Sequence, residues 1–63
     1  MQRFHLTITA ENAAFYPDPA FEIARILREV ANRIEAGESF DKYRNLHDAN
    51  GNIVGTFALK EEE

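Results

Sequence analysis

Cysteine is absent from this 63-residue chain, which excludes disulfides and thiolate metal sites. The two histidines, His5 and His47, cannot close a structural zinc site alone. A chain of this length buries only about 60% of its unfolded surface. Small scaffolds without disulfides or metals rely on idealised packing or on self-association. We therefore expect a homodimer or a higher homo-oligomer, with no metal and no cofactor.

Long apolar runs and an excess of positive charge are also missing. No apolar run approaches the roughly 20 residues that span a membrane, and "MQRFHLTITAENAAF" is too polar for a signal peptide. We expect a cytoplasmic protein without a membrane partner. The net charge of −4 disfavours a generic phosphate-backbone binder. Glu61, Glu62 and Glu63 supply part of that charge, and we expect them to form a solvated acidic tail on a single domain, 1–63.

The N-terminal stretch "RFHLTITA" alternates in polarity, with Phe4, Leu6 and Ile8 on one side. This pattern is typical of a half-buried β-strand. "ENAAFYPDPA" then interrupts it, and Phe15 and Tyr16 are expected to fold back over the core. Asp18 is a candidate helix cap before a proline at the first helical position.

A helical period follows from Pro19 to about Ala36. Ile23, Leu27, Val30 and Ile34 fall within a narrow arc of a helix and predict its buried stripe. Gly37 is a typical stop just past the last turn.

Asn50-Gly51 lies between two extended runs and predicts the tip of a β-hairpin. This register places Leu46 opposite Gly55, and Arg44 opposite Phe57. Ile53, Phe57 and Leu59 would then face inward with Leu46. The sequence thus predicts an α+β fold in the order β-α-β-β, a three-stranded, mainly antiparallel sheet with one helix packed on one face.

One helix leaves the second sheet face open. The residues expected there are His5, Thr7, Thr9, Tyr43, Asn45, His47, Val54, Thr56 and Ala58. This face is half apolar, short of charge and contains both histidines. It could pair with its own copy, remain solvated, or serve as a platform for a ligand.

The stretch "LHDANGNIVG" spaces Asp48, Asn50 and Asn52 like the first ligands of a calcium loop. An EF-hand loop also needs glycine at its sixth position and a bidentate glutamate at its twelfth. Those positions are Ile53 and Leu59, so calcium binding is not expected. Asp48 and Asn52 are expected to bond to the backbone of the turn instead.

Nothing in the chain has the spacing of a catalytic site. Neither His5 nor His47 has a carboxylate or nucleophile at diagnostic distance, and Ser39, the only serine, lacks an elbow motif. The helical glutamates Glu22, Glu29 and Glu35 are interpreted as surface charges. We therefore expect no enzymatic activity.

The outer face of the helix carries a more distinctive group: Phe21, Arg25, Arg28 and Asn32. Phe21 could simply pack against Phe15 or Tyr16, with the arginines solvated. Alternatively, the group forms a patch for an acidic partner, a phosphate or a nucleotide, because arginine suits bidentate recognition. Arg3 and Arg44 could add charge at the sheet edge.

Two segments, "NAAFYPDPAFEIARILREVANRIEAG" and "LHDANGNIVGTF", resemble a family of small, uncharacterised bacteriophage and prophage proteins. The resemblance covers about residues 12 to 57 and carries no known active site. Members often have arginine where this chain has His47. The resemblance implies a phage-encoded protein acting inside a bacterial host, where small accessory proteins often work by binding.

These observations favour a non-enzymatic binding protein that sequesters or inhibits a host partner. One form inhibits a host protein such as a defence component. The other sponges a small anionic ligand such as a nucleotide. A dimeric nucleic-acid-associated regulator is the alternative. The candidate binding residues are Phe21, Arg25, Arg28, Asn32, His5, Tyr43, Arg44 and His47.

Overall fold

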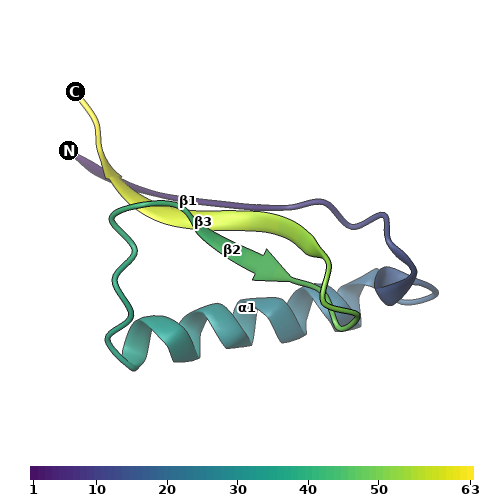
Figure 1. The fold of residues 1–63 in the computed structure, drawn as a ribbon. Helices are drawn as coiled ribbons and strands as arrows, with labels where there is room; N and C mark the ends of the chain where they lie inside the picture. Colours follow the sequence, from purple (N-terminus) through teal and green to yellow (C-terminus); the bar gives the residue numbers. More distant parts are fainter.

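The computed structural model, which describes residues 1–63, is an open antiparallel sheet with one helix on one face (Figure 1). In chain order the elements are β1 (Gln2–Ile8), the 3-10 segment η1 (Ala13–Phe15), α1 (Pro19–Glu35), β2 (Arg44–His47) and β3 (Ile53–Glu61). The strands lie in the order β1-β3-β2. The predicted β-α-β-β order and α+β class are confirmed. The helix α1 is neither long nor apolar enough to cross a membrane.

The hairpin register follows the Asn-Gly turn as predicted. Leu46 pairs with Gly55, and Arg44 pairs with Phe57. Gly51 has a φ of 84°, a backbone conformation that glycine adopts without strain. A Cβ at Gly55 would lie 1.8 Å from the Thr7 carbonyl oxygen, so only glycine allows β1 to approach β3 so closely there.

A β-bulge next to the turn reverses two of the predicted orientations. The register shifts between Leu46 and His47, so that His47 pairs with Ile53 and Val54 becomes an extra residue on β3. Val54, expected on the open face, is buried in the core, whereas Ile53, expected inside, is 62% exposed. The reason is that one inserted residue changes the alternation of side chains along the strand.

The core between sheet and helix is small. It consists of Phe15, Ile26, Val30, Leu46, Val54 and Phe57. On α1 the buried apolar positions are Ile26 and Val30, while Ile23 and Ile34 are half-buried and Leu27 is 45% exposed. The predicted stripe is therefore rotated toward Ile26, and Leu27 was wrongly placed inside.

The ends of α1 agree only partly with prediction. Pro19 occupies the first helical position, but the Asp18 side chain makes no capping hydrogen bond. At the other end, the Gly37 and Glu38 N–H groups donate to Ile34 and Arg33 carbonyls, and Gly37 has a φ of 92°. This is the glycine-terminated helix end that the sequence predicts.

The predictions for the segment before α1 and for the acidic tail are only partly correct. Phe15 is buried, but Tyr16, expected to fold over the core with it, is 83% exposed. In the acidic segment 61–63, Glu61 is the last residue of β3, opposite Gln2. The next N–H, that of Glu62, donates to the Met1 carbonyl at 2.7 Å, so the sheet pairing extends into that segment.

Candidate interaction surfaces

Two arginines of α1 attach the helix to the outer edge of β2. Arg25 Nη2 donates to the His47 carbonyl and Arg33 Nη1 donates to the Asn45 carbonyl, each at 3.1 Å. Because backbone groups alternate along an antiparallel strand, Asn45 and His47 are the residues whose carbonyls point away from β3. The two guanidinium groups thus occupy acceptors of an edge that would otherwise be open to another strand.

Each of these arginines is also paired with a glutamate. Arg25 forms two hydrogen bonds to the Glu22 carboxylate, both 2.9 Å, and Arg33 binds Glu38 in the same bidentate manner. The hydrogen bonds from Arg25 hold the pKa of Glu22 below its ordinary value, and those from Arg33 do the same for the pKa of Glu38. These side chains therefore act first as structural ion pairs.

Glu22 is the main residue that sequence reasoning placed wrongly in this region. It was interpreted as a surface charge, but only 4% of it is exposed. Besides Arg25, its carboxylate accepts the Ala49 N–H at 2.8 Å, which ties the hairpin to the first turns of α1. A signal was available, because Glu22 lies four residues before buried Ile26 and therefore on the same side of the helix.

The hairpin tip is ordered around Asp48, which is 4% exposed. Its carboxylate accepts the N–H groups of Asn50 and Asn52, both at 2.9 Å, and the side-chain amides of Asn12 and Asn52. Burial alone would raise the pKa of Asp48, but these hydrogen bonds outweigh it and lower the pKa to about 2. The predicted Asx support of the turn is confirmed. The carboxylate's oxygens are fully occupied by the protein's own donors.

The Glu22 and Asp48 contacts bring three segments together at one end of the molecule: the loop around η1, the start of α1 and the hairpin tip (Figure 1). Three large apolar side chains are exposed on these segments. Tyr16 is 83%, Phe21 66% and Ile53 62% exposed. We call Tyr16, Phe21 and Ile53 together the hairpin-end surface, because the segments that carry them meet at this end of the molecule. Phe21 lies on the outer side of α1, and Ile53 lies on β3.

The predicted patch on the outer face of α1 is only partly free. Phe21, Arg28 and Asn32 are exposed, but the guanidinium of Arg25 is turned to Glu22 and to His47. Arg28 makes no ion pair or side-chain hydrogen bond, unlike Arg25. Arg44, the candidate cation at the sheet edge, donates to Glu38 at 3.1 Å.

The open sheet face carries charged pairs that the sequence did not reveal. The Glu62 carboxylate accepts a hydrogen bond from His5 Nε2 at 3.0 Å and forms an ion pair with Arg3 at 3.1 Å. Lys60 Nζ lies 5.4 Å from the centre of the Tyr43 ring. His5 pairs with Ala58 and His47 pairs with Ile53, which separates the histidines by about 17 Å along β3. The two histidines therefore do not form one site.

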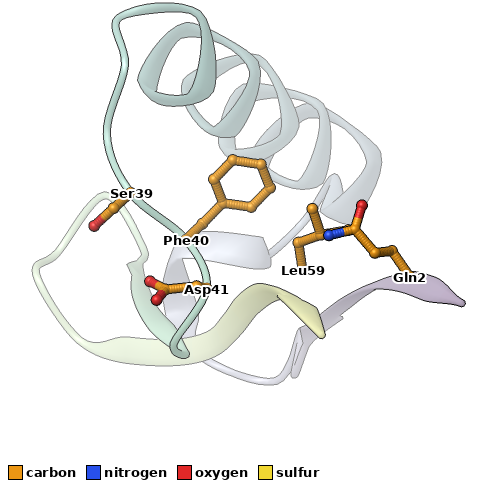
Figure 2. A pocket seen from close by; sticks show the side chains of 5 residues that line it. All are labelled: Gln2, Ser39, Phe40, Asp41 and Leu59. Carbon is orange, nitrogen blue, oxygen red and sulfur yellow. The ribbon is translucent and has the colours of Figure 1, made fainter. Parts of the chain in front are cut away.

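One pocket of about 330 Å³ lies beside the loop that follows α1 (Figure 2). Its lining residues are Gln2, Ser39, Phe40, Asp41 and Leu59. The Phe40 ring points toward α1 and packs against Phe4 and Phe57, with ring centres 6.1 Å and 6.2 Å apart. The pocket contains neither histidine and none of the candidate binding residues.

No family model matches this chain, and the comparisons with curated proteins and with solved structures likewise give no significant match.

Proposed function

We propose that this chain is a small, non-enzymatic binding protein of phage type that inhibits or sequesters a host protein, such as a defence component. The observation that carries the proposal is the contrast between its charged and its apolar side chains. Arg3, Arg25, Arg33 and Arg44 are all engaged by the protein's own glutamates. The hairpin-end surface instead exposes three large apolar side chains.

Such a surface suits a protein partner. Aromatic side chains that become buried are frequent anchors of protein interfaces. The segments that carry Phe21 and Ile53 are joined by the hydrogen bond from Ala49 to Glu22 and by the contact of Arg25 with the hairpin. A surface held in place before binding loses less conformational entropy when the partner docks. Arg28, seven residues after Phe21 on the same face of α1, would border the contact with a cation.

A small anionic ligand has weaker support. Arg28 and Lys42 are the only Lys or Arg side chains without an ion pair, a hydrogen bond or a ring contact, and they lie on different elements. Recognition of a phosphate or nucleotide usually requires several converging cations or backbone donors. The same shortage, with a net charge of −4, disfavours a nucleic-acid surface.

Quantitative affinity capture tests this proposal. Tagged full-length chain is incubated with lysate of a bacterial host, and captured proteins are compared by mass spectrometry among wild type, Phe21→Lys and Lys42→Ala. We expect a host protein that is captured by wild type and by Lys42→Ala but reduced at least tenfold by Phe21→Lys. Circular dichroism checks that the variants are folded. Equal capture by all three, or a thermal shift with nucleotides that Arg28→Ala removes, would contradict the proposal.

A further inference from the structure

The sheet has two edges, and only one of them is protected. At the β2 edge, arginines of α1 occupy carbonyl groups, as described above. The other edge is β1, seven residues long, which pairs on one side with β3. β1 contains no proline and no bulge in its register with β3, two of the devices that prevent an edge from pairing, and its one Lys or Arg residue is Arg3.

The residues that face this free edge can be identified from the bonds to β3. Just outside the two ends of β1, the Thr9 N–H donates to the Val54 carbonyl and the Met1 carbonyl accepts the Glu62 N–H. The backbone N–H and C=O groups of the odd-numbered residues therefore point toward β3. By alternation, the backbone groups of Gln2, Phe4, Leu6 and Ile8 point away from it. No side chain of the protein bonds to any of them. Their N–H and C=O groups form a row available to another strand.

An apolar flank of α1 continues this edge. Around the helix, the apolar arc runs from Ile26 through Val30, Ile23 and Ile34 to Leu27 and then to alanines. The face of α1 that carries Arg25 and Arg33 contacts β2 through their guanidinium groups. The face that carries Leu27 therefore lies toward β1. The sheet of one chain buries only the Ile26 half of the arc, and both Leu27 and Phe4 remain 45% exposed. We call Phe4, Leu6, Ile8, Ile23, Leu27 and Ile34 the β1-edge surface.

The accessible surface of the chain is larger than that of a compact monomer of the same mass, as expected if the β1-edge surface is uncovered in the single chain. Its accessible surface is 4487 Å² for a mass of 7.2 kDa. A compact folded monomer of this mass is expected to expose about 4,100 Å². The chain is also elongated, 39 × 25 × 17 Å.

We propose that a second copy of this chain covers the β1-edge surface, with the two β1 strands paired antiparallel about a two-fold axis at His5. In this register Phe4 lies opposite Leu6 of the second copy, and Gln2 lies opposite Ile8. Those are the residues whose backbone groups face outward, and the pairing forms about eight backbone hydrogen bonds. All apolar side chains of both strands then fall on the helix side of a continuous six-stranded sheet.

Three properties favour a second copy over a different strand. The edge is complementary to itself, because the same register satisfies every free group on both strands. Arg3 lies opposite Thr7 of the second copy, so no like charges meet across the strands. The only edges left in the pair are the two β2 edges, which the arginines already cap. The assembly therefore closes at two copies.

This inference does not depend on what the hairpin-end surface binds. Phe21 lies on the outer face of α1, away from β1, and remains exposed in the pair. The two-fold axis places the two hairpin-end surfaces at opposite ends of the dimer. Failure of one proposal would therefore leave the other standing.

Solution mass tests the interface. Light scattering on the full chain should give about twice the 7.2 kDa of one chain. Leu27→Lys, which places a charge in the flank without filling any buried space, should give one chain mass with an unchanged circular dichroism spectrum. Phe21→Lys is the matched control and should remain dimeric. A monomeric wild type, or a dimer that Leu27→Lys leaves intact, would overturn the proposal.

The register has its own test, because the chain contains no other cysteine. At the axis, His5 residues of the two copies form a pair that is not hydrogen-bonded, with Cα atoms about 4.5 Å apart. That spacing permits a disulfide. His5→Cys should cross-link into a covalent dimer under mild copper oxidation, and adding Leu27→Lys should abolish it. Thr7→Cys, whose thiols would be about 13 Å apart, should stay monomeric on a non-reducing gel. Cross-linking at Thr7 in place of His5 would overturn this register.

Discussion

Arg25 holds the Glu22 carboxylate through two hydrogen bonds of 2.9 Å at the junction of α1 with the hairpin. The same guanidinium donates to the His47 carbonyl, and Glu22 accepts the Ala49 N–H. One ion pair within the helix thus reaches both strand β2 and the turn that follows it. This ion pair positions the hairpin-end surface, although both Arg25 and Glu22 are charged.

Arg25→Ala should destabilise the fold by about 2 kcal/mol, because it leaves the buried Glu22 carboxylate with a single donor. The cost is lower than for a fully enclosed pair since 37% of the Arg25 side chain is exposed. The measurement is urea denaturation at pH 7. Arg28→Ala, on the same helix but without a partner, serves as control and should change stability by less than about 0.5 kcal/mol. Equal effects of the two substitutions would argue against a structural role for Arg25.

The stability of the protein should fall as the pH drops from about 4 to about 2. The pKa of Asp48 is lowered from 3.8 to about 2 in the folded chain, because its hydrogen bonds together outweigh burial, which acts in the opposite direction. In this window the unfolded chain binds more protons, so acid favours unfolding. The contribution of Asp48 is complete above its unfolded pKa and is lost as the pH falls through the folded value.

Asp48→Asn provides the comparison for this pH effect. The variant should be less stable than wild type at pH 7, because an amide cannot accept all four hydrogen bonds. It should also lose less stability between pH 4 and pH 2. Part of the dependence should remain, since the pKa of Glu22 is lowered as well, chiefly by Arg25. Denaturation curves for the two proteins at several pH values check this, and parallel pH profiles would contradict the role given to Asp48.

Gly55→Ala should destabilise the sheet by about 3 kcal/mol or more, since its methyl group would overlap the Thr7 carbonyl and separate β1 from β3. Gly37→Ala is the matched control. It meets no atom within 4 Å, but its φ of 92° disfavours alanine, which should cost about 1 kcal/mol. Thermal unfolding followed by circular dichroism ranks the two variants. A smaller loss for Gly55→Ala than for Gly37→Ala would show that the strands can separate at little cost.

Local sequence signals predicted the elements of this fold correctly. Asn50-Gly51 set the register of Leu46 against Gly55, and Gly37 ended α1. These features depend on backbone preferences of neighbouring residues, which a sequence displays directly. The β-bulge beside His47 has no such local signal in the sequence. It alone exchanged the expected positions of Ile53 and Val54.

The orientation of α1 depended on contacts between distant residues. The apolar period centres near Leu27, yet the helix is turned so that Arg33 reaches the Asn45 carbonyl and Arg25 that of His47. A hydrogen bond from a charged side chain to an edge carbonyl does not produce a periodic pattern in the sequence. Arg25 and Arg44 are held in ion pairs with glutamates, and Phe21, Arg28 and Asn32 are the exposed part of the predicted patch.

In the proposed function, binding depends on exposed apolar side chains rather than on cations. The most direct test of this dependence is the amount of one host protein captured by Phe21→Lys and by Arg28→Ala, each relative to wild type at equal concentration. We predict at least a tenfold loss for Phe21→Lys and less than a threefold loss for Arg28→Ala. Full capture by Phe21→Lys together with loss by Arg28→Ala would contradict the claim.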